Sequence, residues 1–191
     1  MTWQDDIKFN RAIKQVMTHE GGFVDHPDDP GGATNFGVSL RYLRDAGHDL
    51  GDIDGDGDID YQDIKALTPA RAKAIYYDRF WMPNYYANMP PIVAGKMLDL
   101  AVVMGPSQAN KLLQRALSVI EDDFGQSVDL RDDGRIGPAT LAAISDRARS
   151  EARWATRVAL RASSEMFFRW LATHRPSSKV FLAGWVARSR W

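Results

Sequence analysis

Apolar residues recur at intervals of three and four along most of the chain, which is the spacing of an amphipathic helix. In the first such segment Phe9, Ile13 and Val16 form one stripe, and the next position on that stripe is Glu20. Two glycines follow directly, and glycine readily ends a helix. The pattern therefore predicts a first helix whose apolar face finishes at a carboxylate.

Capping residues and prolines divide the remainder of the chain into further helices. We expect them over residues 39–47, 68–82, 92–104, 107–117 and 150–173, with another opening at Gly137 and Pro138. The expected N-caps are Ser39, Thr68 and Ser107. In the last helix the expected buried stripe consists of Ala155, Ala159, Ala162, Met166 and Trp170.

The segment between the first two helices has a different character. Residues 23–38 contain two prolines and three glycines, which favours an irregular loop or a short hairpin. The chain shows no internal repeat and no linker long enough to separate independent domains. The sequence therefore predicts an all-α orthogonal bundle with one small loop or hairpin insert after the first helix.

Composition narrows the class of protein. The chain has 191 residues, of which 45% are hydrophobic and 26% charged, as in ordinary globular proteins. Cysteine is absent, so disulfides and zinc–thiolate sites are excluded. No apolar run approaches the roughly 18 residues of a membrane span. No signal peptide is recognisable at the start, so we expect the chain to begin in the cytoplasm.

Charge is distributed unevenly along the chain. Residues 1–130 hold 12 Lys/Arg and 20 Asp/Glu, a balance of -8, whereas residues 131–191 hold 12 and 5, a balance of +7. A basic C-terminal part can hold an anionic polymer, either nucleic acid or bacterial wall, or can simply be an arginine-rich solvated helix face. No helix-turn-helix or aromatic-interleaved pattern supports nucleic acid.

Glu20 is the first candidate for catalysis. Burial at the end of an apolar stripe raises the pKa of a carboxyl group, which lets it act as a general acid. The alternative is that Glu20 only reaches solvent at a frayed helix end. The loop that follows offers polar partners within fifteen residues: Asp25, Asp28, Asp29, Thr34 and Asn35.

These residues resemble the signature of glycoside hydrolase family 108. The likeness is carried by HEGGF at 19–23 and DDPGGATNFGVS at 28–39, and it continues at residues 76–81 and 99–102. DGRIGPATL at 133–141 and GWVAR at 184–188 resemble that family's C-terminal peptidoglycan-binding lobe. The resemblance implies a lysozyme-like fold, with a muramidase region over 1–105 and a wall-binding lobe over 106–191 packed with it as one unit.

The resemblance also implies roles for individual residues. Glu20 becomes the catalytic acid, and Asp29 with Thr34 the partner pair, with Asp25 as the rival second carboxylate. Substrate contacts are expected from Asp25, Asn35, Phe36, Tyr76 and Asp99. One departure stands out, because Val103 occupies a position where relatives usually carry Asn.

A second constellation lies at residues 52–63. Counted from Asp52, aspartates occupy the positions that bind calcium in an EF-hand loop, with Gly57 at the sixth position and Ile59 at the eighth. The predicted ligands are Asp52, Asp54, Asp56, Asp58 (through its carbonyl), Asp60 and Asp63. Position 12 is Asp where Glu is usual. We expect one structural Ca²⁺ here, or else a plain acidic loop, and no metal in catalysis.

Three hypotheses for function follow. The favoured one is an endolysin-type N-acetylmuramidase that cleaves the β-1,4 bond between N-acetylmuramic acid and N-acetylglucosamine, with a lytic transglycosylase as its closest mechanistic competitor. The others are a non-catalytic wall-binding or assembly protein and a calcium-responsive interaction protein. The expected partner is bacterial peptidoglycan in the periplasm, reached by a holin or by secretion, and the expected state is a monomer.

Overall fold

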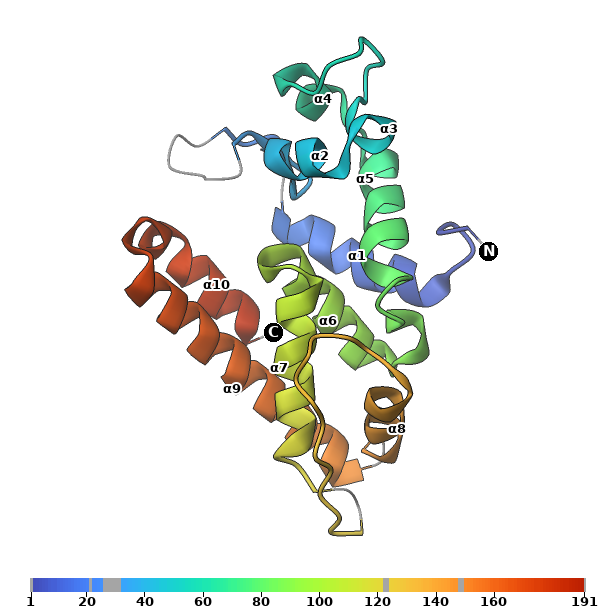
Figure 1. The fold of residues 1–191 in the computed structure, drawn as a ribbon, viewed down its shortest axis with the longest axis vertical. Helices are drawn as coiled ribbons and strands as arrows, with labels where there is room; N and C mark the ends of the chain where they lie inside the picture. The colour runs from blue at the N-terminus through green and yellow to red at the C-terminus, as the bar shows by residue number, and fades with distance from the viewer. Residues whose placement is uncertain (1, 21, 26–31, 122–123, 148–149, 191) are drawn as a thin grey trace. The chain divides into compact units, whose positions relative to one another are not determined.

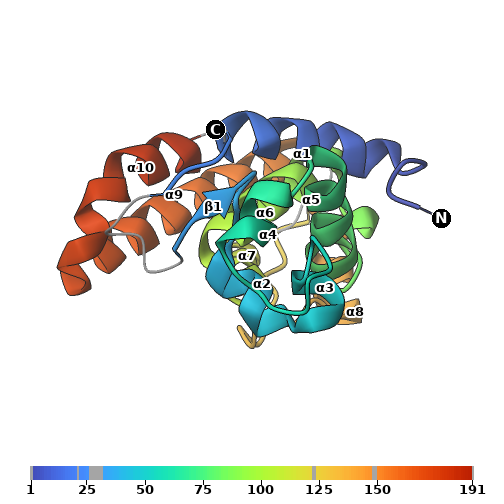
Figure 2. The same ribbon diagram turned by 90° about the horizontal axis from the view of Figure 1, so that it is seen from above.

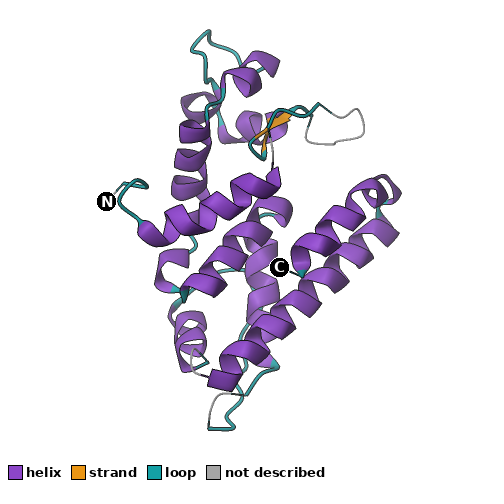
Figure 3. Cartoon of the chain, turned by 180° about the vertical axis from the view of Figure 1, so that it is seen from behind, coloured by secondary structure: helices purple, strands orange, loops and turns teal. Residues whose placement is uncertain are grey.

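The computed structural model describes residues 2–20, 22–25, 32–121, 124–147 and 150–190 (Figure 1). Helices make up most of these residues, and the sheet has only two short strands (Figure 3). This confirms the predicted all-α, lysozyme-like class with a small insert. The chain divides into two compact units, Met1–Arg79 and Phe80–Trp191. No helix in the described segments is both long and apolar enough to cross a membrane.

The first unit consists of short helices around a small hairpin. Its elements are α1 (Ile7–Glu20), β1 (Thr34–Asn35), β2 (Val38–Ser39), α2 (Leu40–Ala46), α3 (His48–Gly51), α4 (Tyr61–Ala66) and α5 (Pro69–Tyr76). Phe9, Ile13 and Val16 of α1 are each at most 1% exposed, which confirms the predicted stripe. Phe9 of this stripe packs edge-on against the ring of Tyr77, with 5.0 Å between centroids.

Local caps set several helix ends where the sequence predicts them. Ser39 accepts a hydrogen bond from the backbone N–H of Tyr42, and Thr68 accepts one from that of Arg71. Each hydroxyl satisfies one of the donors left free at a helix N-terminus. After α5 the backbone widens into a π-helical turn, Tyr77–Trp81, which the sequence did not predict.

The second unit is built around a buried helix. Its elements are η2 (Tyr86–Asn88), α6 (Pro91–Met104), α7 (Pro106–Ser118), α8 (Pro138–Asp146), α9 (Ser150–His174), η3 (Pro176–Phe181) and α10 (Leu182–Ser189). Residues 93–101 of α6 are all buried, as expected for a helix that is apolar on every side. The long helix α9 runs beside α10 in both views (Figures 1 and 2).

Two expectations for this unit are wrong. Gly105 is the N-cap of α7, and Ser107 lies inside the helix, because Pro106 occupies the first helical position that its fixed φ angle favours. In α9 the buried row is Thr156, Leu160, Ser164, Phe168 and Ala172. Met166 and Trp170, which were expected to be buried, are 70% and 54% exposed.

Candidate active site and acidic loop

The hairpin of the first unit returns the chain to the end of α1. The backbones of Val24 and Thr34 exchange two hydrogen bonds of 2.8 Å each and form an antiparallel bridge. Glu20, the last residue of α1, precedes Val24 by four residues, so its Cα lies within about 14 Å of that bridge. The fold thus keeps the backbone end of α1 within that distance of the bridge that carries Thr34.

Two of the predicted substrate contacts hold this hairpin in place. Asn35 is 6% exposed, and its side-chain amide donates to the carbonyl of Ile64 at 2.9 Å. Tyr76 is 2% exposed, and its hydroxyl donates to the carbonyl of Phe36 at 2.9 Å. These buried hydrogen bonds fix the hairpin to α4 and α5, so both side chains position the loop.

The turn between the strands carries the third predicted contact. Thr34 pairs with Ser39 and Asn35 with Val38, which leaves Phe36 and Gly37 as the two turn residues. Both have positive φ, 50° and 79°, as the tight primed turns of hairpins require. Phe36 is a bulky residue in a left-handed conformation that the Tyr76 hydrogen bond helps to maintain, and its side chain is partly exposed.

The structure describes the side chains of only some of the predicted catalytic residues. Thr34 is partly exposed, and its hydroxyl donates to the carbonyl of Gly32 at 3.2 Å. Asp25 is exposed beside the bridge. Asp28 and Asp29 lie outside the described residues, as does the side chain of Glu20, so their roles stay predictions.

Asp99 lies in the second unit and has a different environment. It is fully buried on α6, where it accepts a hydrogen bond from Nε of Arg188 at 2.7 Å and lies 3.7 Å from Nζ of Lys96. Burial lowers the pKa of Lys96 to about 8, against the opposing effect of the Asp99 charge. This ion-paired cluster ties α6 to α10, and a contact between Asp99 and substrate would require it to open.

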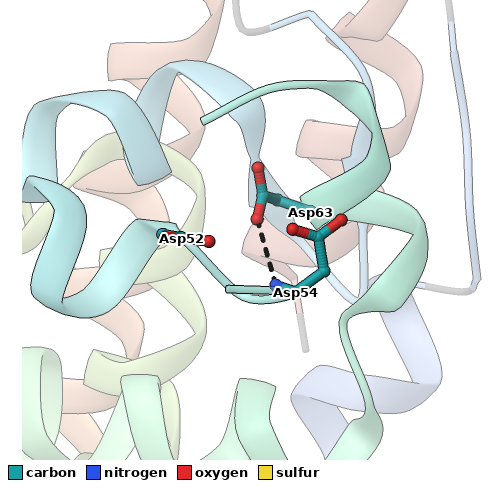
Figure 4. A group of neighbouring side chains, drawn as sticks. All are labelled: Asp52, Asp54 and Asp63. Carbon is teal, nitrogen blue, oxygen red and sulfur yellow. Dashed lines mark hydrogen bonds between the residues drawn. The ribbon is translucent and has the colours of Figure 1, made fainter. Parts of the chain in front are cut away.

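The acidic loop folds around one buried carboxylate. Asp63 is fully buried, and its two oxygens accept from the backbone N–H groups of Ile53 at 2.6 Å and Asp60 at 2.7 Å. The Asp63 oxygen that binds Ile53 is also 3.3 Å from the amide nitrogen of Asp54 (Figure 4). Asp52 accepts from the N–H groups of Gly55 and Gly57. The loop is therefore closed by hydrogen bonds between its own ends.

Carboxylate oxygens of the loop gather in two groups that share Asp63, and Asp56, a predicted ligand, belongs to neither. Oxygens of Asp52, Asp54 and Asp63 all lie within 4.8 Å of one another, and those of Asp58, Asp60 and Asp63 form a second such group. Calcium holds its oxygens at about 2.3–2.6 Å, so ligands on opposite sides are about 5 Å apart. Oδ1 of Asp63 already accepts from two backbone N–H groups, so a cation would be held through Oδ2. The residues present thus fit a Ca²⁺ ion.

The carboxylates of the loop repel one another, and this repulsion contributes to their pKa shifts. The pKa of Asp54 is raised by partial desolvation and by the neighbouring Asp56, and the pKa of Asp58 is raised chiefly by the Asp56 charge. The pKa of Asp63 is lowered, because the backbone hydrogen bonds outweigh the effect of burial. A bound cation would relieve this repulsion.

A second Asp/Gly loop, residues 132–137 in the other unit, has hydrogen-bond partners within the protein, and we call it the Asp133 loop. The N–H of Gly134 donates to Oε1 of Gln114, and its carbonyl accepts from the side-chain amide of Asn110. Asp133 accepts from Nε2 of Gln114 and from the N–H of Arg135, and these bonds lower its pKa. The sequence offered no reason to connect Gln114 and Asn110 with this loop, because only the fold brings them together.

Comparison with known proteins identifies both regions. Residues 13–105 match the model described as glycosyl hydrolase 108, and residues 108–190 match the predicted peptidoglycan domain. SagA of Brucella abortus, a solved structure, is 30% identical with a TM-score of 0.73, and the match covers 95% of this chain and 89% of SagA. The chain belongs to glycosyl hydrolase family 108. No curated protein matches it significantly.

Family membership relates both matched regions to the same polymer. A family 108 domain followed by a peptidoglycan domain makes the protein a glycoside hydrolase that acts on peptidoglycan. The hairpin and the acidic loop lie in the hydrolase region, whereas the Asp133 loop lies in the peptidoglycan domain. The matched segments meet near Gly105, which also ends α6 and caps α7.

Proposed function

We propose that this family 108 enzyme is an N-acetylmuramidase that cleaves the β-1,4 bond after N-acetylmuramic acid, with Glu20 as general acid. The observation that carries the proposal is local. Glu20 ends the buried stripe of α1, four residues before the strand bridge that brings Thr34 back to it. Glycoside hydrolysis uses two carboxylates that flank the bond, and the loop after Glu20 carries Asp25 and Asp29 as candidates for the second.

The proposed reaction uses the chain's own groups. The protonated carboxyl of Glu20 donates its proton to the glycosidic oxygen as the C–O bond breaks. A second carboxylate, Asp29 or its rival Asp25, then acts either as base toward a water molecule or as nucleophile at the anomeric carbon. The hydroxyl of Thr34 positions the water, and Phe36 offers an exposed edge to a sugar ring.

Precise placement of the hairpin is part of this mechanism. Asn35 and Tyr76 are buried and hydrogen-bonded to backbone, so we assign them to positioning Thr34 and Phe36. Misplacing reacting groups by a fraction of an ångström lowers the rate substantially. Both residues thus act on catalysis through the loop that they hold.

We further propose that residues 52–63 bind one structural Ca²⁺ through Asp52, Asp54, Asp56, Asp60 and Asp63 and the carbonyl of Asp58. When bound, the ion supplies charge neutralisation within the loop. Short helices, α3 and α4, flank it, which favours a clip over a sensor. The clip joins α3 to α4, and the carbonyls of Ile64 in α4 and of its C-cap Leu67 accept from the Asn35 side chain.

The deciding experiment replaces the proposed acid and identifies the products. Glu20→Gln should lower the release of muropeptides from purified sacculi by about 10²–10⁴-fold, because general acid–base steps contribute that much. Glu121→Gln, an exposed glutamate in the other unit, is the matched control and should keep wild-type activity. Thermal melting of both variants should equal that of the wild type.

Mass spectrometry of the wild-type products distinguishes the remaining hypotheses for function. Reducing muramic acid ends support hydrolysis, whereas 1,6-anhydro ends would assign a lytic transglycosylase instead. Absence of any cleavage products, with intact binding to sacculi, would assign a wall-binding protein. Near-normal activity of a folded Glu20→Gln variant would contradict the assignment of the acid.

A further inference from the structure

The last helix of the chain, α10, is held in place through one narrow face. Ser189 is the one buried residue of this helix. Trp185, Arg188 and Ser189 are spaced by three and four residues, so they share one face of α10. The ring of Trp185 stacks on that of buried Phe168 in α9, with 5.3 Å between centroids. The position of α10 therefore depends on the contacts of this face.

On its own, α10 has little reason to stay helical. It has eight residues, and its N-cap, Phe181, makes no side-chain hydrogen bond to the first turn. Helices shorter than about 12–15 residues are marginal in water unless packing stabilises them. Elements at the end of a chain also open at a lower free energy than the core does. We therefore expect α10 to exchange between a docked and an open state.

A buried charged cluster holds the docked state on α6. Nζ of Lys96 donates to the carbonyl of Arg188 at 2.6 Å, and Nε of Arg188 donates to Oδ1 of Asp99 at 2.7 Å. Lys96 is 6% exposed and Asp99 is fully buried. Lys96 and Asp99 lie in the hydrolase match, whereas Arg188 lies in the peptidoglycan match. These two hydrogen bonds thus connect the two matched regions.

The charges of this cluster do not balance. Lys96 and Arg188 are two cations beside the single carboxylate of Asp99, and Arg161 of α9 adds a further positive charge. Burial is the main cause that lowers the pKa of Lys96 to about 8. The charges of Arg188 and Arg161 act in the same direction, and Asp99 acts against them. Because an arginine keeps its proton, Lys96 is the cation here that can lose its charge.

Proton linkage gives the direction of the effect on docking. In the open state Lys96 is in water, where the pKa of a lysine is about 10.5. Between these two pKa values the docked state binds fewer protons than the open one. Docking therefore strengthens as pH rises through about 8, and the gain is complete near 10.5. The neutral amine of Lys96 still donates a hydrogen bond to the carbonyl of Arg188.

We propose that α10 docks reversibly on α6, firmly when Lys96 is neutral and loosely when Lys96 is protonated. The connection between the hydrolase region and the peptidoglycan domain then responds to pH. In alkaline surroundings the two regions are joined more firmly than in neutral ones. Lys96 is the residue that sets this response, and Asp99 with Arg188 provides the ion pair that remains when its charge is lost.

The other charged tie of α10 does not respond in the same pH range. Arg190 lies 3.2 Å from Glu165 of α9, and both side chains are accessible to solvent. Hydrogen bonds from Arg190 and Arg169 lower the pKa of Glu165 to about 2. Glu165 therefore stays ionised from pH 7 to 9, and an exposed ion pair of this kind contributes little to docking.

The test uses a single introduced thiol, because the chain has no cysteine of its own. Ser189→Cys places the thiol at the buried position, where Ellman's reagent reaches it only after α10 opens. Ala187→Cys, at an exposed position of the same helix, gives the unprotected rate at each pH. The ratio of the two rates measures protection. It should rise about tenfold from pH 7 to 9, as linkage with a docked pKa near 8 requires.

Variants of lysine show whether Lys96 causes the rise. With Lys96→Met added to both thiol chains, protection should not change between pH 7 and 9. Lys96→Gln, which keeps a hydrogen-bond donor without charge, should give the same result. Lys179→Met, an exposed lysine of η3, is the matched control and should keep the tenfold rise.

Two results would overturn the proposal. One is a protection ratio that stays constant from pH 7 to 9 in the chains with Lys96 intact. The other is an unchanged rise in a folded Lys96→Met or Lys96→Gln chain. The measurement uses no substrate, so its outcome is independent of the proposed muramidase activity.

Discussion

Two loops of this protein are similar in sequence, but their aspartates have different surroundings. Residues 52–63 and the Asp133 loop are both rich in Asp and Gly. In the first, partial desolvation and then the Asp56 charge raise the pKa of Asp54, and the Asp56 charge raises that of Asp58. In the second, hydrogen bonds from Gln114 and Arg135 lower the pKa of Asp133. In the first loop like charges act on one another, and in the second the Asp133 carboxylate is hydrogen-bonded by neighbouring protein groups.

The two loops therefore differ in structural role. The acidic loop gathers oxygens into groups of the size that a cation fills. The Asp133 loop instead uses buried Asn110 and Gln114 on α7 as its anchor. The Asp133 loop, whose sequence resembles a wall-binding signature, is therefore a structural staple of the peptidoglycan domain.

Gly134→Ala should have the largest effect on stability. The glycine has a φ of 78°, and an added Cβ would lie 2.7 Å from both the carbonyl and the hydroxyl oxygen of Ser107. Steric overlap with backbone adds to the strain of a left-handed conformation, so we expect a loss of about 3 kcal/mol or more. Urea denaturation of the purified variant measures it. A loss below about 1 kcal/mol would show that the staple is looser than described.

Removal of calcium should have the next largest effect on stability. It should act only through residues 52–63. A ligand that binds the folded state alone adds about 2.7 kcal/mol at a hundredfold excess over Kd. We expect the melting temperature to fall with chelator and to recover with Ca²⁺, and recover poorly with Mg²⁺, which prefers fewer oxygens. Asp54→Ala should abolish the response.

The control for that experiment is Asp45→Ala, an exposed aspartate outside the loop in the same unit. It should respond to calcium as the wild type does. If the wild type melts at the same temperature in chelator and in calcium, and calorimetry detects no binding, residues 52–63 are only a charged loop.

Gly57→Ala should cost less than Gly134→Ala. Its φ of 96° is equally unfavourable for alanine, but nothing lies within 4 Å of the added Cβ. Only the conformational strain remains, so we expect a loss of about 1 kcal/mol in the presence of chelator. The difference between the two losses, measured by the same denaturation, gives the steric part. Equal losses would contradict the open environment of Gly57.

The sequence predicted helix ends better than helix faces. Ser39, Thr68 and Gly105 mark boundaries because a cap or a positive φ is a local requirement. The face of α9 was predicted incorrectly because the helix carries two rows of apolar residues. Packing selects the row with Thr156 and Ser164, and leaves bulky Met166 and Trp170 in solvent.

For the candidate site, sequence located the residues and structure assigned their contacts. Spacing alone indicated the acidic loop, since its ligands are close along the chain. Asn35 and Tyr76 were predicted near the substrate, but their hydrogen bonds reach across 29 and 40 residues. Long-range partners of this kind leave no local pattern, so the positioning role was not predictable.

The smallest expected effect is on the pH dependence of stability, where the two loops should respond with opposite sign. A lowered carboxyl pKa in the folded state gives stability that is present above the unfolded pKa and lost as pH falls through the folded one. A raised pKa gives stability that is present at low pH and lost as pH rises. Asp133→Asn should therefore lose most, relative to wild type, near pH 6 and least near pH 3.

Asp58→Asn, measured in chelator, should show the reverse trend. Removing its charge relieves repulsion from Asp56, so the variant should gain stability relative to wild type as pH rises from 3 to 6. Denaturation midpoints at several pH values, taken for both variants side by side, measure the two slopes. Parallel slopes would mean that the carboxylates of the acidic loop do not repel one another in the folded state. With calcium added, the gain of Asp58→Asn should shrink, because the ion neutralises the same charges.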